Sequence, residues 1–395
     1  MIWNESTSRL AGPAKVPSMS NLSKCLGIET RPYQMRITSK AVQMLQGEFK
    51  RGDGGMDREV DSVMIESPTG SGKTVMGLLI ARWMQQRYGF TIGWASHRNG
   101  LLDQALAENK RWGFGVDLRP VPLRDRRAPK VDLLIVDEAQ HEGSNSMASL
   151  CRGVGARKIV GLTATPVHSD RNRLFCDRVI KDVGIHTLIQ EGYLARYRHF
   201  TIPDFDPYTV ANTYLTEPNR WGKSLIFFHR LEQCLECQNM FKEAGIRSQI
   251  VTANSNRERQ LERFANGELD VLINRNVLTE GFDCPDLQTV FCRPSSRART
   301  IQMVGRVLRK HPGLSHKQVV QSKDSRHPFV KTAIADDQLT WSRDCWRSSV
   351  QGPRIAEATA SSPNASTGSI ANLSKIMLGH CKPEIPWQFQ TAESA

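Results

Sequence analysis

The sequence lacks the features that mark a membrane or secreted protein. No apolar run approaches the roughly 20 residues that a membrane-spanning helix needs. Residues 1–21, MIWNESTSRLAGPAKVPSMSN, contain no apolar signal core. We therefore expect a cytoplasmic, intracellular protein that has no membrane partner.

Paired metal ligands are also scarce. The nine cysteines are scattered, and an odd number of scattered cysteines is typical of a reduced, intracellular chain. Only Cys234 and Cys237 lie close together, in RLEQCLECQNMF, and no second pair or histidine cluster completes a zinc set. We expect this pair to pack within a helix. Nuclease and methyltransferase patterns are missing too, so a nuclease partner would have to be another chain.

Positive charge is in excess. Lys and Arg number 53 against 40 Asp and Glu, which gives a net charge of +13 and a pI near 9.5. Such an excess favours polyanionic partners, nucleic acid first. The length of 395 residues suggests two or three domains.

Short apolar runs alternate with helical patterns in two stretches of the chain. The runs of the first stretch are SVMIES, TIGWAS, KVDLLIVDEA and RKIVGLTATP, and those of the second are KSLIFFH, RSQIVTA, DVLINR and TVFCRP. This alternation predicts an α/β fold of two domains, each an open parallel sheet with crossover helices. We predict a polar tail (1–28), a first domain (29–200), a linker (201–222), a second domain (223–312) and a partly low-complexity, partly flexible C-terminal extension (313–395).

The segment SPTGSGKT, residues 67–74, follows an apolar run and opens a helical pattern. This is the context of a phosphate-binding loop, in which successive backbone N–H groups surround phosphate oxygens. We expect Lys73 to reach the outer phosphates, the Thr74 hydroxyl to hold Mg²⁺, and Gly70 and Gly72 to permit the tight backbone path. Ser67 stands where the general pattern has its first glycine.

The segment LLIVDEAQH places Asp137 and Glu138 at the end of an apolar strand. Adjacent side chains of a strand point in different directions. Asp137 can therefore join the Mg²⁺ shell while Glu138 orients and activates a water molecule, and hydrolysis of a γ-phosphate needs both functions.

With these motifs the chain resembles a superfamily 2 helicase or translocase of the DEAD/DEAH type. The resemblance is closest to the branch of restriction-type helicase subunits and phage recombination helicases, and its motifs cover about residues 31–310. It implies two tandem RecA-like parallel-sheet domains of the P-loop NTPase class, with ATP and Mg²⁺ as cofactors. The nucleotide-contacting loop would comprise Thr69, Gly70, Ser71, Gly72, Lys73 and Thr74. In RPYQ, the resemblance implies that Gln34 bonds the adenine edge and that Tyr33 supports it.

The resemblance also assigns residues to strand binding and to the domain interface. ASHRNGLLDQ implies Arg98 near a nucleic-acid backbone and Gln104 on the same helix. LTATP implies that Thr163 and Thr165 link nucleotide state to strand binding. The segment VLTEGFDCP implies interface positions at Thr279, Glu280, Gly281 and Asp283, of which Thr279 is also assigned to nucleic acid and Gly281 and Asp283 to the nucleotide.

The last motif, QMVGRVLR, contains Gln302, Gly305, Arg306 and Arg309. By resemblance, Arg306 and Arg309 are arginine fingers that reach from the second domain to the γ-phosphate. Arginine suits this role because its planar fork stays charged and pairs bidentately with phosphate oxygens. Gln302 would share in this catalytic motif.

Four departures from the family pattern leave alternatives open. The basic run LRDRRAPK either replaces missing strand contacts or is a solvated loop. Gln140 of DEAQH, or His141, can bridge to the last motif. Arg275 either contacts a strand phosphate or is a strand-end charge. The tryptophans Trp341 and Trp346 either stack on a base or, as we favour, pack against the second domain.

We thus expect an ATP-hydrolysing nucleic-acid helicase or translocase, with DNA favoured over RNA by family analogy. The alternatives are an ATP-gated nucleic-acid switch, a subunit that does not unwind by itself, and an RNA helicase. A protein partner could bind the C-terminal extension.

Overall fold

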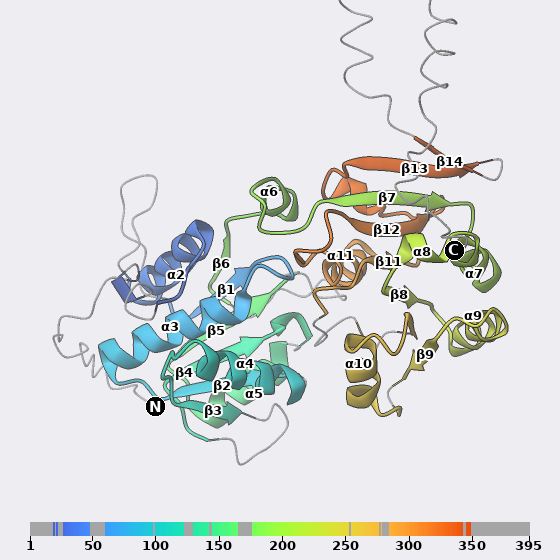
Figure 1. The fold of residues 1–395 in the computed structure, drawn as a ribbon. Helices are drawn as coiled ribbons and strands as arrows, with labels where there is room; N and C mark the ends of the chain where they lie inside the picture. The colour runs from blue at the N-terminus through green and yellow to red at the C-terminus, as the bar shows by residue number, and fades with distance from the viewer. Residues whose placement is uncertain are drawn as a thin grey trace, which may run out of the picture. The chain divides into compact units, whose positions relative to one another are not determined.

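The computed structural model describes residues 19, 21–22, 27–47, 60–97, 99–121, 129–141, 144–164, 176–252, 254–275, 278, 284–342 and 345–348. Within them the chain forms two sheets, one of six strands and one of eight, with helices between the strands (Figure 1). This arrangement agrees with the predicted pair of RecA-like domains.

The first sheet has the strand order β3-β2-β4-β5-β1-β6, and all its pairs are parallel. Its strands are β1 (Ser62–Glu66), β2 (Ile92–Ser96), β3 (Leu118–Val121), β4 (Leu133–Asp137), β5 (Lys158–Thr163) and β6 (Arg178–Lys181). The central strands β1, β4 and β5 are buried along almost their whole length. Helices on both faces of a parallel sheet cause this burial, which explains why the runs are apolar throughout.

The helices of this half are α2 (Pro32–Leu45), α3 (Lys73–Tyr88), α4 (Asn99–Arg111), α5 (Ser144–Val154) and α6 (Ile185–Gln190), with a 3₁₀ turn, η1 (Ala139–His141). Proline stands at the first position of α2, where its missing N–H costs nothing, and the backbone N–H of Arg31 donates to Gln34 Oε1 at 2.9 Å. Gly89 ends α3 in the left-handed region, with φ +68°. Helices α2 and α3 pack on each other (Figure 1).

The second sheet has the order β14-β13-β7-β12-β11-β8-β10-β9. Its strands are β7 (Tyr197–Ile202), β8 (Ser224–Phe227), β9 (Ser248–Val251), β10 (Val271–Asn274), β11 (Thr289–Phe291), β12 (Lys317–Ser322), β13 (Asp337–Ser342) and β14 (Cys345–Ser348). The pairs from β13 to β9 are parallel.

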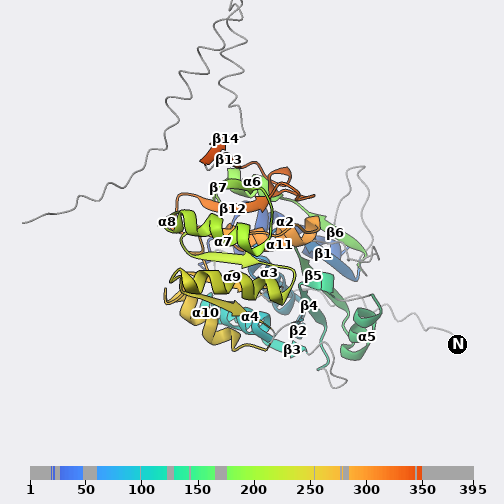
Figure 2. The same ribbon diagram turned by 90° about the vertical axis from the view of Figure 1, so that its right-hand side faces the viewer.

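The helices of the second half are α7 (Pro207–Thr216), α8 (Pro218–Trp221), α9 (Leu231–Glu243), α10 (Arg257–Ala265) and α11 (Arg297–Gly305), with a 3₁₀ turn, η3 (Phe329–Lys331). Figure 2 shows α7 and α9 side by side, in agreement with their mutual packing. Cys234 and Cys237 are fully buried in α9, which confirms the predicted helix packing. Burial raises the pKa of the Cys234 thiol to about 11.

The structure corrects the predicted domain boundaries. β7 was placed mostly in the first domain (29–200), but it pairs with β12 of the second sheet along its whole length, and α7, within the expected linker (201–222), packs on α9. The expected extension from 313 likewise contributes β12 and β13 to the second sheet. The sequence pattern missed β7 and β13 because β7 mixes buried with more exposed positions and β13 has no fully buried position, whereas the central strands are continuously apolar.

An aromatic cluster joins the ends of this half. The Trp346 ring lies 4.9 Å from that of Phe200 and 5.9 Å from that of Trp221, and its indole N–H donates to Glu217 at 2.9 Å. Trp341 meets Trp346 edge to face at 4.9 Å. These contacts confirm that the tryptophans pack against the second domain. Within the described part of the chain, no helix is long and apolar enough to cross a membrane.

Candidate active site

The loop of residues 67–74 connects β1 to α3. Gly70 and Gly72 both have φ +81°, a left-handed conformation that glycine adopts without steric cost. Ser67, at the departure from the general motif, is fully buried and donates from its hydroxyl to Ser71 Oγ at 2.7 Å. Its backbone N–H donates to the carbonyl of Thr163 at 2.9 Å. The serine thus closes the loop with a side-chain hydrogen bond that glycine could not form.

Helix α2 supports this loop from outside. The hydroxyl of Tyr33 and the amide Nε2 of Gln34 both donate to the carbonyl of Ser71, at 2.7 and 2.9 Å. The guanidinium of Arg31 donates to the Tyr33 hydroxyl at 2.9 Å. A Cβ atom at Gly72 would stand 2.4 Å from Gln34 Nε2, so any larger residue there would have to displace the end of the Gln34 side chain. Both polar atoms of the Gln34 amide form hydrogen bonds within the protein, Oε1 with the backbone N–H of Arg31 and Nε2 with the carbonyl of Ser71. The expected bond to the adenine edge stays a prediction.

The acidic pair stands at the end of β4 in an unusual backbone geometry. Glu138 has φ +51°, and it is the only residue besides glycine with positive φ in the part of the chain that the structure describes. This conformation costs a residue other than glycine about 1–2 kcal/mol. The backbone N–H of Glu138 donates to Asp137 Oδ1 at 2.9 Å, which helps to hold the turn.

A buried hydrogen-bond relay continues from this pair into the neighbouring strand. Gln140 Nε2 donates to Glu138 Oε2 at 2.9 Å, and the Thr163 hydroxyl donates to Gln140 Oε1 at 2.6 Å. These bonds connect the acidic pair to β5, and a bridge from Gln140 or His141 to the last motif stays a prediction. Thr163 is fully buried, so it can influence strand binding only through other residues.

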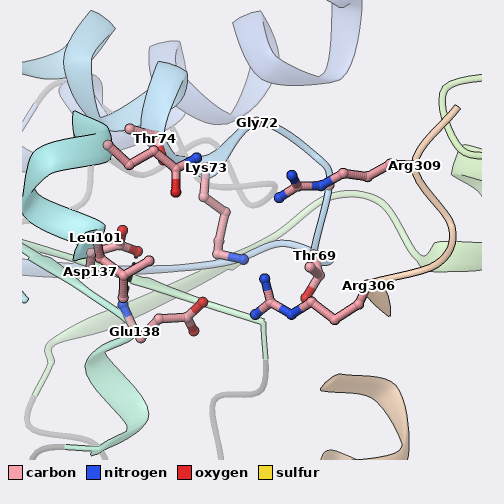
Figure 3. A pocket seen from close by; sticks show the side chains of 11 residues that line it. Thr69, Gly72, Lys73, Thr74, Leu101, Asp137, Glu138, Arg306 and Arg309 are labelled. Atoms are coloured by element: carbon pink, nitrogen blue, oxygen red, sulfur yellow. Dashed lines mark hydrogen bonds between the residues drawn. The ribbon is translucent and has the colours of Figure 1, made fainter. Parts of the chain in front are cut away.

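The arginines of the last motif reach the same place from the second half of the chain (Figure 3). Helix α11 ends at Gly305, so Arg306 and Arg309 lie in the turn after the helix. Burial lowers the pKa of Arg309, yet arginine stays protonated at neutral pH. Gln302 lies on α11, partly buried, and is not among the residues that line the cavity.

These groups line one cavity of about 90 Å³, several times the volume of a water molecule. The lining residues are Thr69, Gly70, Gly72, Lys73, Thr74, Leu101, Gln104, Asp137, Glu138, Arg306 and Arg309. In Figure 3 the Lys73 side chain extends between the carboxylates and the two arginines. Cations of two chain halves, two carboxylates and the loop backbone thus meet where a polyphosphate would bind.

Sequence reasoning missed the contribution of α4. Leu101 was not predicted, and Gln104 was assigned to nucleic acid, whereas both line the cavity. Residues three apart lie on the same face of a helix. The spacing of Leu101 and Gln104 could therefore have predicted that both side chains point to the same place.

The oxygen atoms present fit Mg²⁺. The Thr74 hydroxyl and the Asp137 carboxylate both line the cavity, and Mg²⁺ prefers a few such oxygens together with phosphate and water. No group of three or more His, Cys, Asp or Glu side chains that could hold a metal occurs among the described residues.

Several predicted residues lie outside the described part of the chain: Arg98, Thr165, Thr279, Glu280, Gly281 and Asp283, the side chain of His141, and most of the basic run LRDRRAPK. Arg275 is described, and it is exposed directly after β10. Its role at a strand phosphate stays a prediction.

Comparisons with known proteins give two matching family models. Residues 208–311 match the helicase conserved C-terminal domain, and residues 27–115 match the res subunit of type III restriction enzymes. Among similar proteins is a 51.5 kDa protein of Lactococcus phage (isolate 7-9), 28% identical over 268 residues, which are 59% of this chain and 59% of that protein. Another is the putative ATP-dependent helicase IRC3 of Saccharomyces cerevisiae, 27% identical over 231 residues, which are 48% of this chain and 34% of that protein. The match therefore spans only about a third to three fifths of these relatives' length.

Solved structures support the fold. The structure of S. cerevisiae Dbp5 bound to RNA and ADP BeF3 has a TM-score of 0.53 and 15% identity, and the match covers 78% of this chain and 87% of that one. The two family models and the similarity to helicases such as IRC3 together support a superfamily 2 helicase of the restriction-type branch.

Proposed function

We propose that the protein hydrolyses ATP and uses the cycle to move along, or to unwind, nucleic acid. The observation that carries this proposal is the shared cavity, in which Lys73 and Glu138 of the first half face Arg306 and Arg309 of the second (Figure 3). A site composed of both halves is complete only while they are together. Binding and loss of the γ-phosphate would therefore change how strongly the halves are held to each other.

Most of the lining residues have a defined role in this proposal. The backbone N–H groups from Gly70 to Thr74 and the ammonium of Lys73 bind the β- and γ-phosphates. Thr74 and Asp137 would hold Mg²⁺, which when bound neutralises phosphate charge and orients the phosphates for attack.

Glu138 accepts a proton from the attacking water. Arg306 and Arg309 stabilise the negative charge that develops on the transferred phosphoryl group. Asp137 and Glu138 are both more than nine-tenths buried, and limited access of water strengthens these interactions.

We further propose DNA as the preferred polymer. The support is the match to a restriction-enzyme subunit together with the net charge of +13. The solved Dbp5 structure contains RNA, but at 15% identity that likeness concerns the fold. Binding by a basic surface releases counterions, so affinity should fall steeply with salt.

The test is steady-state ATPase activity with single-stranded DNA, duplex DNA, forked DNA or RNA, at two salt concentrations. We expect stimulation by DNA that weakens with salt, and loss of nearly all activity in Lys73→Ala. Activity that survives Lys73→Ala would refute the phosphate-loop assignment. Stronger stimulation by RNA would refute the DNA preference.

A second variant tests the arginine assignment. Arg306→Ala should keep nucleotide affinity and lose hydrolysis by about 10³-fold, the range seen for arginine fingers. If Arg306→Ala lowers nucleotide affinity as much as it lowers hydrolysis, Arg306 does not act as an arginine finger. Hydrolysis that no polymer stimulates would instead favour an ATP-gated switch or a subunit that needs a partner.

A further inference from the structure

Gln104 lies on a wall of the cavity that the sequence motifs did not assign to the nucleotide. It lies on α4, one turn after Leu101, and both side chains line the cavity. Figure 3 shows Leu101 beside Asp137, across the cavity from Arg306 and Arg309. Helix α4 therefore supplies the wall next to the carboxylates, opposite the arginines.

The amide of Gln104 differs chemically from the charged side chains around the cavity. Lys73 and the two arginines only donate hydrogen bonds, and ionised Asp137 and Glu138 only accept them. A primary amide does both. The Gln104 side chain is partly buried and forms no hydrogen bond with any residue in the part of the chain that the structure describes. Its donor and acceptor are thus available to a molecule in the cavity.

The other groups able to both donate and accept at this site already have contacts or roles. The Thr69 side chain packs against the position of Gly305. Thr74 lies in the first turn of α3, where its hydroxyl fits the metal. Gln140 is near the acidic pair but is bonded to Glu138 and Thr163. Gln104 also lines the cavity and can both donate and accept hydrogen bonds. Within the described part of the chain it has neither such a contact nor an assigned role.

We propose that Gln104 is a catalytic residue that orients the attacking water, an inference that rests on ATP hydrolysis at this cavity. Oε1 accepts a hydrogen bond from the water, and Nε2 donates to a γ-phosphate oxygen. The water lone pair forms the new O–P bond, one water proton passes to the Glu138 carboxylate, and the bond from the γ-phosphorus to the bridging oxygen breaks with its electron pair leaving on ADP. A glutamine amide performs this orienting role in small GTPases.

This assignment gives Glu138 a partner. A carboxylate alone fixes one O–H direction of the water, whereas a second acceptor fixes the other and directs the lone pair at phosphorus. Gln104 approaches from α4 and Glu138 from the end of β4, so two separate elements hold the water. From the sequence, Gln104 was predicted to contact nucleic acid. Because Gln104 lines the cavity, we assign it to the hydrolytic site.

The test uses Gln104→Leu, which keeps the size and removes both hydrogen-bonding atoms, and Gln104→Glu, which removes the donor. Asp103→Asn, at the exposed neighbouring position of the same helix, is the matched control. In the Leu variant we expect kcat to fall roughly tenfold to a hundredfold, while KM for ATP, the Mg²⁺ dependence and the affinity for ADP stay within about twofold. Affinity for ADP with aluminium fluoride, which mimics the transition state, should fall in proportion to kcat.

Other results would overturn the inference. A normal kcat in both variants excludes the role. Loss of ADP affinity in proportion to kcat means that Gln104 only supports the fold, and the melting temperature of each variant checks this. If the variants bind single-stranded DNA more weakly but keep their basal hydrolysis, Gln104 contacts the nucleic-acid strand and does not orient the water. If the wild-type protein hydrolyses ATP and Lys73→Ala does not, a negative result for Gln104 leaves the proposed function intact.

Discussion

Gly305 of α11 lies directly against Thr69 of the phosphate loop. A Cβ atom at position 305 would stand 2.8 Å from the Cβ of Thr69 and 3.1 Å from its Oγ1, and Cβ atoms do not approach other atoms so closely without displacement. Only glycine permits this contact. It brings the two arginines that follow α11 next to the loop that would hold the phosphates.

Gly305→Ala should therefore separate nucleotide binding from hydrolysis. The added methyl group pushes α11 away from the loop, and a displacement of about 1 Å can cost about 10²-fold in rate. We expect kcat to fall by at least about tenfold with ADP affinity nearly unchanged. Steady-state kinetics and ADP titration measure both. Gly153→Ala, in α5 with open space around its Cα, is the control and should be fully active.

The relay from Glu138 through Gln140 to Thr163 predicts a change in pH dependence. Gln140→Glu places a second carboxylate beside Glu138, and like charges raise the pKa of a carboxyl group. Glu138 must be ionised to accept a proton, so the acid limb of the pH–rate profile should move to higher pH. An unchanged acid limb would mean that Glu138 is not the base. Thr163→Val, which removes only the hydroxyl, should lower kcat without this shift.

The support of the phosphate loop by Tyr33 predicts a change in affinity. Tyr33→Phe removes one of two hydrogen bonds to the Ser71 carbonyl, while Gln34 keeps the other. One such bond contributes about 1 kcal/mol, so we expect KM for ATP to rise about fivefold with little change in kcat. Tyr208→Phe, at an exposed position on α7, is the control. A fall in kcat alone would contradict the supporting role.

Burial of His199 predicts a loss of stability in mild acid. His199 lies in β7, with its Nε2 3.1 Å from Gln321 Oε1, and burial lowers its pKa below the ordinary value of 6.5. Below that pH the unfolded chain binds a proton that the folded chain excludes, so the free energy of unfolding falls as the pH falls. Urea unfolding at pH 7.5 and 5.5 should show this decrease.

His199→Leu should reduce that dependence on pH. Some dependence should remain, because the pKa of His229 is lowered as well. His327→Leu, which replaces an exposed histidine, should leave it unchanged. If His199→Leu keeps the full acid dependence, another group is responsible for it.

The sequence was sufficient for the motifs whose chemistry is local. A glycine-rich loop between a strand and a helix and two acids after a buried strand are read from neighbouring residues alone. The alternation of apolar runs was enough for two parallel sheets. It failed at β7 and β13, because strands with exposed or half-buried positions have a weaker pattern, and these two strands were not predicted as part of the second sheet.

The residue types of this protein determined by themselves what the site can bind: backbone amides and cations for phosphates, and oxygens for a metal. Only the tertiary structure decided which of them meet. In the tertiary structure Gln140 is bonded to Thr163, Gly305 lies against Thr69, and Gln104 lines the cavity. Contacts between residues far apart in the chain depend on how helices pack on sheets, and no local pattern encodes that packing.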